Sequence, residues 1–201
     1  MDEIVLKSMA KWPDVPHVFG WLGLDPRGNW LIKDQRISNP VITEFIGRNY
    51  HVDEQGRWFF QNGPQRVFVT LAYAPFVLWT RGTGADACLL THTGVELDTV
   101  SGAWIDESGT LILRWSAGEV GSVSDRDLAE IAGWFTNAAG QAISDEAVAK
   151  AIESRIAHGS TGIWLNYRAH RLPVGRVKSD QVPRKFGFDR SPAPEPGQPD
   201  C

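Results

Sequence analysis

The residues best suited to chemistry are five histidines, and their spacing argues against a local catalytic or metal site. They are His17, His51, His92, His158 and His170. No two are three or four positions apart, and no cysteine lies near a histidine at the spacing that zinc ligands use. We therefore expect no metal site.

His51 lies beside two carboxylates, Asp53 and Glu54. An imidazole and a carboxylate can share proton transfer, so an enzyme whose acid–base groups meet only in the folded chain is one alternative. The simpler interpretation is a turn after a helix, because "HVDEQG" carries the Asp and Gly that are typical of turns. From the sequence we assign no catalytic residue.

The known cofactor motifs are also missing from the sequence. "GTGADA" at 82–87 has the letters of a dinucleotide fingerprint. That motif needs a helix directly after it, so that free N–H groups can hold the pyrophosphate. Here "CLLTHTGVEL" follows and predicts a hairpin instead, with Cys88 as a small buried apolar residue. We expect no cofactor.

The stretch "GRWFFQNGPQRV" predicts a hairpin with an aromatic core. A four-residue loop at 62–65 pairs Phe60 with Val67 and keeps Pro64, which has no N–H, out of the ladder. A two-residue Asn-Gly turn would shift the register but keep the same residues on each face. Alternation then points one set of side chains to the core: Trp58, Phe60, Val67, Val69 and Leu71.

The opposite face of this hairpin is the first candidate binding site. It would carry Arg57, Phe59, Gln61, Arg66 and Phe68. Arginine and aromatic side chains are the usual anchors of binding surfaces. We expect this face to be partly exposed or covered by a partner.

A second candidate is "GIWLNYRAHRLPVGRVK", which places Arg168, His170 and Arg171 among aromatic residues. Three interpretations remain open: a half-buried strand with a solvated face, a site for an anion or a protein, and a nucleic-acid surface. From 155 to 190 there are eight basic and two acidic residues, whereas from 86 to 153 there are three basic and 12 acidic ones. The two segments therefore also suit each other within one fold, and with a net charge of −4 nucleic acid is the least favoured partner.

The elements that must position these residues form a predicted α+β fold of antiparallel hairpins. Nine Trp, 12 Pro and 20 Gly indicate many short strands and tight turns. "LDPRGNWLIKDQRI" predicts two strands, and "SNPVITEFIGRNY" a helix capped by Asn39 with Pro40 in its first turn. "IDESGTLILRW" and "SDRDLAEIAGWF" repeat that order, followed by a helix from a Ser144 cap to a Gly159 stop.

We therefore expect two related β-rich units in one compact body. The predicted divisions are an N-terminal arm at 1–16, a first unit with one helix at 17–82, a connecting hairpin at 83–99, a second unit with two helices at 100–180, and a largely disordered, Pro-rich tail at 181–201. The strands that begin near Trp58 and Trp164 should be equivalent, because "GRW" and "GIW" precede similar hairpins.

The segments "GNWLI", "ISNPVITEFIGRNY", "DEQGRWFFQNGPQRVFV" and "APFVL" resemble an uncharacterised bacterial family known only as a domain of unknown function. More loosely, the chain is similar to a second such family, with Asp-Gly-x-Trp, a helix, and a hairpin leading to Ala-Pro. The likeness covers about 17–80 well and the second half in outline. It implies a soluble β-rich fold with a repeated motif and a role in signalling or ligand sensing, and it transfers no catalytic residue.

Together these observations favour a non-catalytic, cytoplasmic accessory or sensing protein. Its partner would be a small anionic ligand or another protein. Cys88 and Cys201 are too far apart to indicate a disulfide framework, which suits a reducing compartment. No apolar run reaches the roughly 18–20 residues of a membrane span.

Overall fold

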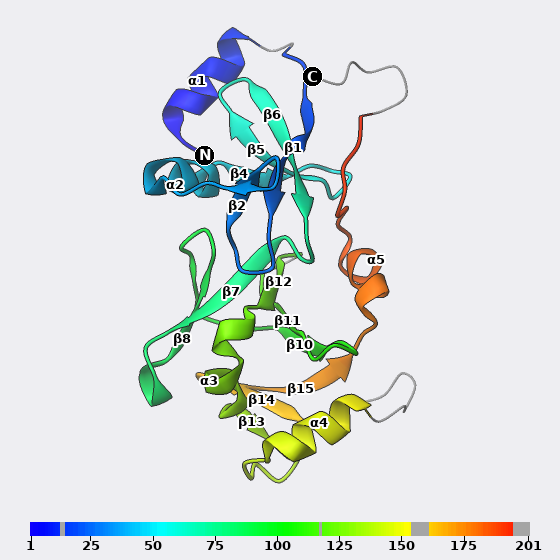
Figure 1. Ribbon diagram of the computed structural model, residues 1–201. Helices are drawn as coiled ribbons and strands as arrows, with labels where there is room; N and C mark the ends of the chain where they lie inside the picture. Colours follow the sequence, from blue (N-terminus) through cyan, green and yellow to red (C-terminus); the bar gives the residue numbers. More distant parts are fainter. Residues whose placement is uncertain (13–14, 117, 154–160, 195–201) are drawn as a thin grey trace. The chain divides into compact units, whose positions relative to one another are not determined.

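The computed structural model describes residues 1–12, 15–116, 118–153 and 161–194 (Figure 1). The chain divides into unit 1, Met1–Pro75 with Gly187–Cys201, and unit 2, Phe76–Phe186. Both units combine helices with sheets, so the predicted α+β class is confirmed. None of the helices in the described part of the chain is long and apolar enough to cross a membrane.

Within the described residues, unit 1 is built on a six-stranded sheet in the order β3-β2-β1-β6-β5-β4. Its strands are β1 (Val18–Leu24), β2 (Trp30–Ile32), β3 (Gln35–Arg36), β4 (Tyr50–Val52), β5 (Trp58–Asn62) and β6 (Gln65–Leu71). β1 pairs in parallel with β6, and the other neighbours are antiparallel. Its helices are α1 (Glu3–Lys11), within the predicted arm, and α2 (Pro40–Arg48).

The β5–β6 hairpin has the predicted register. Phe60 pairs with Val67, but the ladder continues to Asn62 and Gln65, so the loop consists of Gly63 and Pro64 and not of the predicted four residues 62–65. The predicted core residues Trp58, Phe60, Val69 and Leu71 are buried, while Val67 is half-buried. Alternating apolar residues were sufficient to predict this register, although not the length of the loop.

The expectation for the opposite face of the hairpin was wrong. Phe59, Phe68 and Gln61 are 5%, 1% and 1% exposed. Phe59 and Phe68 form a small core with Phe19 of β1, whose ring stacks on Phe68 at 4.6 Å between centroids. Because β1 joins the sheet beside β6 from a distant part of the chain, the hairpin sequence alone could not indicate this burial.

The start of α2 agrees with the sequence prediction. The Asn39 side chain accepts a hydrogen bond from the N–H of Val41, and Pro40 opens the helix. On its predicted apolar stripe, Ile46 is buried and Phe45 half-buried, but Val41 is 71% exposed and Ile42 45% exposed. The stripe is therefore buried only toward its C-terminal end.

Within the described residues, unit 2 is built on a nine-stranded sheet in the order β13-β14-β15-β10-β11-β12-β7-β8-β9. Its strands are β7 (Phe76–Arg81), β8 (Cys88–Thr91), β9 (Glu96–Leu97), β10 (Gly102–Ile105), β11 (Leu111–Arg114), β12 (Val120–Val123), β13 (Phe135–Thr136), β14 (Trp164–Tyr167) and β15 (His170–Arg176). Its α-helices are α3 (Leu128–Ala132), α4 (Asp145–Glu153) and α5 (Val182–Phe186). Short 3-10 helices lie at η1 (Gly84–Asp86), η2 (Asp125–Asp127) and η3 (Ser179–Gln181).

The two units share one strand plan. In unit 2, β12-β11-β10-β15-β14-β13 repeats the order β3-β2-β1-β6-β5-β4, and β10 is parallel to β15 as β1 is to β6. Trp58 and Trp164 each begin the equivalent strand, and each pairs with the last residue of the strand before it, Val52 or Thr136. The predicted relation between the units is therefore confirmed, with β7–β9 and α4 as additions in unit 2.

One turn type recurs at four matching places, with the sequence Asp/Asn-x-x-Gly-x. In each copy the first side chain accepts N–H bonds from residues two and four positions later, and the glycine has φ between 76° and 83°. The four turns start at Asp25, Asp53, Asp106 and Asn137. The positive φ explains the glycine, since other residues rarely adopt it. Asp25 and Asp106 thus mark equivalent positions in the two units.

The C-terminal segment differs from the expected disordered tail. Residues 179–186 form η3 and α5, Phe188 is 8% exposed, and the backbone of Asp189 forms an isolated parallel β-bridge with that of Arg57. The backbone carbonyl of Arg190 accepts from the N–H of Leu71 at 2.8 Å. The contacts that order this segment come from distant parts of the chain, and its own sequence lacks periodicity. Residues 195–201 of the predicted tail, and the predicted Gly159 helix stop, lie outside the described residues.

Candidate functional site

The structure brings the first five predicted binding residues together in unit 1. Arg57, Phe59, Gln61, Arg66 and Phe68 share one face of the sheet, since Phe59 pairs with Phe68 and Gln61 with Arg66. The Arg57 guanidinium carbon lies 4.7 Å from the Phe68 ring centre, and that of Arg66 lies 4.7 Å from Phe59. The arginine side chains therefore cover the aromatic rings instead of leaving them open to a ligand.

The carboxylate of Asp53 accepts hydrogen bonds within its own turn, which weakens the alternative of an acid–base site with His51. One carboxylate oxygen accepts the backbone N–H groups of Gln55 and Arg57, and the other accepts Arg57 Nε at 2.8 Å. Burial alone would raise the pKa of Asp53, but the hydrogen bonds and charge of Arg57 hold it below its usual value. A carboxylate held in this way is a poor proton acceptor.

Three buried polar atoms on this face have no hydrogen-bond partner within the described chain: Nδ1 of His17, Nε2 of His51 and Oε1 of Gln61. Burial lowers the pKa of His17, and the nearby charges of Arg66 and Arg57 lower it further. Burial likewise lowers the pKa of His51. Both imidazoles are thus held toward the neutral form. His51 lies on β4 and His17 directly before β1. The two are on opposite sides of the β6–β5 pair, so they form no shared site.

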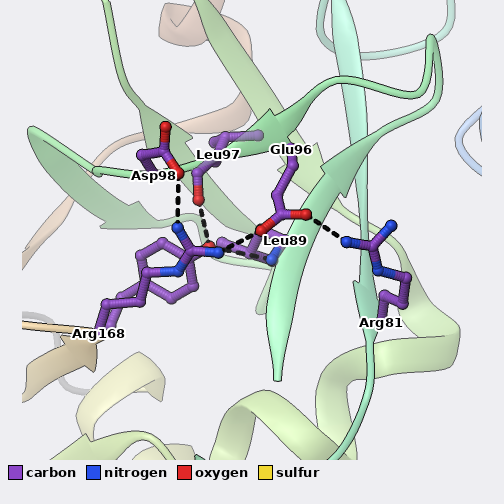
Figure 2. Close-up of polar contacts among 7 residues, drawn as sticks. Arg81, Leu89, Glu96, Leu97, Asp98 and Arg168 are labelled. Atoms are coloured by element: carbon purple, nitrogen blue, oxygen red, sulfur yellow. Dashed lines mark hydrogen bonds and ion pairs between the residues drawn. The ribbon is translucent and has the colours of Figure 1, made fainter. Parts of the chain in front are cut away.

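Arg168 of unit 2 is tied into an ion-pair network (Figure 2). Its guanidinium donates to Glu96 and to Asp98, the latter at 2.7 Å, and Glu96 also pairs with Arg81. The preceding residue, Tyr167, donates its hydroxyl proton to the Leu97 carbonyl at 2.5 Å. Arg168 therefore fastens the β14–β15 turn to β9, and its charge is already matched.

The other two predicted residues of this segment differ from each other. Arg171 donates to the carbonyls of Asn137 and Ala138 at 2.7 and 2.9 Å, and its guanidinium carbon lies 4.7 Å from the Trp164 ring centre. His170 is exposed. Like Arg168, Arg171 supports the fold of unit 2. Arg155, at the start of the basic segment, lies outside the described residues.

A groove of about 560 Å³ lies in unit 2, where sequence reasoning did not place a site. Residues 101–104 and 172–176, on and beside the parallel strands β10 and β15, line it together with Lys185 of α5. Trp104 supplies its aromatic surface, and Arg176 and Lys185 are the charged lining residues. None of these described lining residues is acidic. The charged residues that line the groove are therefore basic, in a chain of net charge −4.

The indole of Trp104 lies flat over two glycines. A Cβ atom on Gly102 would come within 2.3 Å of Trp104 Cη2, and one on Gly175 within 2.8 Å of Cδ1. Gly175 is the direct cross-strand partner of Trp104. Glycine is thus required at both places for the ring to rest on the sheet.

Cationic groups gather at this indole. Lys185 Nζ lies 5.3 Å and the Arg114 guanidinium carbon 5.9 Å from the ring centre. Neither Lys185 nor Arg114 pairs with a carboxylate of any residue that the structure describes. Phe186 packs against the indole with 4.9 Å between centroids and 71° between planes, which holds α5 beside the groove.

The turn after β10 also anchors α5, through the carboxylate of Glu107. Glu107, after β10, accepts hydrogen bonds from the backbone N–H of Ser179, at 2.9 Å, and from its hydroxyl. The hydroxyl bond is the main cause that lowers the pKa of Glu107. The acid next to β10 therefore holds η3, and through it α5, in place.

Unit 1 shows that the strand plan does not require this groove. Counting back two residues from the turn aspartates, Gly23 stands where unit 2 has Trp104. Leu71 pairs with Leu24 as Arg176 pairs with Ile105, so Leu71 stands in the place of Arg176. The β1–β6 pair of unit 1 thus forms without the tryptophan and the arginine. These two residues are thus specific to unit 2.

Sequence reasoning missed the groove because its residues are scattered from 101 to 185. One signal was available. Aligning the turns at Asp25 and Asp106 would have shown a tryptophan opposite a glycine, with a second glycine two positions earlier.

Comparison with known structures supports the fold. A DUF1285 family protein from Silicibacter pomeroyi DSS-3 has a TM-score of 0.51 and 15% identity, over 90% of this chain and 98% of that one. A second DUF1285 family protein, from Shewanella baltica OS155, has a TM-score of 0.40 and 13% identity, over 53% of this chain and 85% of that one. At 15% identity the first likeness concerns the fold alone.

No curated protein matches the chain. A family described as "Protein of unknown function (DUF2946)" matches residues 1–193, which include both units and the groove. The resemblance to an uncharacterised family is thereby confirmed, together with a looser structural relation to a second one. The chain belongs to this DUF2946 family of proteins of unknown function.

Proposed function

We propose that the protein is a non-catalytic module that binds a small organic anion in the groove of unit 2. One observation carries the proposal: a groove of about 560 Å³ lined by Trp104, Arg176 and Lys185 contains no acidic lining residue among those described. This volume is within the roughly 300–1,000 Å³ of small-molecule sites.

The charge of Lys185 gives the groove its preference for anions. Its ammonium group contacts aromatic rings and is not neutralised by a described carboxylate. A ligand carboxylate or phosphate would replace a weak cation–π contact by a charge-assisted hydrogen bond. The arginines predicted from the sequence are weaker candidates, since Arg57 and Arg168 already pair with carboxylates.

The test is a binding measurement with a panel of organic carboxylates and phosphates, by thermal shift and isothermal titration calorimetry. A specific binder raises stability by mass action. Lys185→Gln should weaken binding about tenfold or more, while Arg184→Gln, an exposed neighbour on α5 outside the groove, should not. If no organic anion binds the wild type, or if both variants lose affinity equally, the proposal fails.

The proposal also includes an accessory or sensing role in the cytoplasm. A free, buried Cys88 is compatible with a reducing compartment. Fractionation of cells that produce the tagged protein checks the location, and recovery outside the cytoplasmic fraction would refute it.

A further inference from the structure

We infer that the groove selects organic anions that carry a planar aromatic ring, with the ring stacked on Trp104 and the anionic group held by Lys185. This inference rests on the proposed function and specifies the ligand class of the same site. It starts from how the indole is held.

The ring of Trp104 is a preorganised platform. Gly102 and Gly175 lie under it so closely that even a methyl group would collide with it. One face of the indole is therefore against the sheet, and the residue also lines the groove. A rigid aromatic surface loses little conformational freedom when a second ring stacks on it.

Lys185 is the group that such a ligand would displace from the indole. Its Nζ lies 5.3 Å from the ring centre, and its long side chain can move while α5 stays anchored by Val182, which is 1% exposed. When a ligand ring takes the place over the indole, the displaced ammonium can turn to the ligand's carboxylate or phosphate. Arg176 lines the same groove.

This exchange favours aromatic anions over aliphatic ones of the same charge. Stacking of a ring on an aromatic side chain changes affinity by roughly five- to 150-fold. An aliphatic anion would gain the ion pair with Lys185 but would leave the indole surface without a flat partner. The size of the groove suffices for one ring system with its anionic group.

Unit 1 offers a matched control. Trp21 has a lysine over its ring, with Lys33 Nζ at 3.7 Å, but it lies 44% exposed and does not line the groove of unit 2. If any tryptophan with a nearby lysine bound aromatic anions, Trp21 would do so as well. The inference requires the groove and therefore assigns binding to Trp104 alone.

The experiment compares 2-naphthoate with cyclohexanecarboxylate, and phenyl phosphate with ethyl phosphate, by calorimetry on the full chain. We expect each aromatic member to bind at least about tenfold more tightly than its aliphatic partner. Trp104→Leu should abolish this preference, Trp104→Phe should keep part of it, and Trp21→Leu should leave it unchanged. Circular dichroism confirms that each variant is folded.

The outcomes separate the two claims. If aromatic and aliphatic anions bind wild type equally and Lys185→Gln still weakens both, the proposed function stands and the selectivity is refuted. If the preference survives Trp104→Leu, stacking on this indole is refuted. If none of the four probes binds, both the function and the inference are overturned.

Discussion

Gly175→Ala tests whether the indole of Trp104 is held flat on the sheet. The new Cβ would lie 2.8 Å from Trp104 Cδ1 and 3.1 Å from Nε1. An ordinary carbon–carbon contact is about 3.5 Å or more, so the ring must lift by about 0.7 Å. Overpacking of this kind costs about 1–3 kcal/mol, and the reduced freedom of the unfolded chain returns about 0.4–1 kcal/mol. We therefore expect a net loss of roughly 0.5–2 kcal/mol in the free energy of unfolding.

The matched control is Gly23→Ala, at the equivalent position of unit 1. There the nearest atoms to a new Cβ are the Thr70 carbonyl oxygen at 3.6 Å and Leu31 Cβ at 3.7 Å, which are normal contacts. This variant should be neutral or slightly stabilised. Urea unfolding followed by circular dichroism measures both variants, and 2-naphthoate binding should weaken only in Gly175→Ala. Equal stability of the two variants, with unchanged binding, would refute the account of the platform.

Three further predictions concern the fold of each unit. Tyr167→Phe should lower unfolding free energy by roughly 1–3 kcal/mol, measured in urea, because it leaves the buried Leu89 N–H and Leu97 carbonyl without the hydroxyl; an unchanged midpoint would contradict this. Burial lowers the pKa of His92 from 6.5 to about 3, so the unfolded chain takes up the proton first and stability falls as pH drops below 6.5. Unfolding free energy should decrease by about 1.4 kcal/mol more between pH 7.5 and 5.5 in wild type than in His92→Asn; equal slopes would contradict it. A chain ending at Gly187 should lose roughly 3 kcal/mol, as calorimetry can show, because it lacks buried Phe188; a chain ending at residue 194 should not, and equal melting temperatures would refute the packing of this segment.

Local features of the fold could be predicted from the sequence because their causes are local. The β5–β6 register follows from alternation around Gly-Pro, and the start of α2 from Asn39 and Pro40. The repeat was also visible, since Trp58 and Trp164 follow similar turns and helices. The register and the helix start depend on residues within about one turn or strand of each other, and the repeat is a comparison of two such local patterns.

Features that depend on distant segments could not be predicted. The second face of the hairpin is buried because Phe19 arrives from β1, and Phe188 packs although its neighbours show no apolar pattern. The ion pairs of Arg168 likewise join residues 70 or more positions apart. The groove also depends on distant segments. Trp104 and Lys185 meet only through the parallel pairing of β10 with β15 and the docking of α5.

The most direct measurement of the central claim is an NMR titration that follows the indole N–H signals of the nine tryptophans. Trp104→Phe identifies the signal of Trp104 by its loss. With increasing 2-naphthoate, the account predicts a saturable shift of the Trp104 signal, with that of Trp21 unchanged, and a much weaker response in Lys185→Gln. A saturable shift at another indole without one at Trp104, or no shift at any of them, would contradict it.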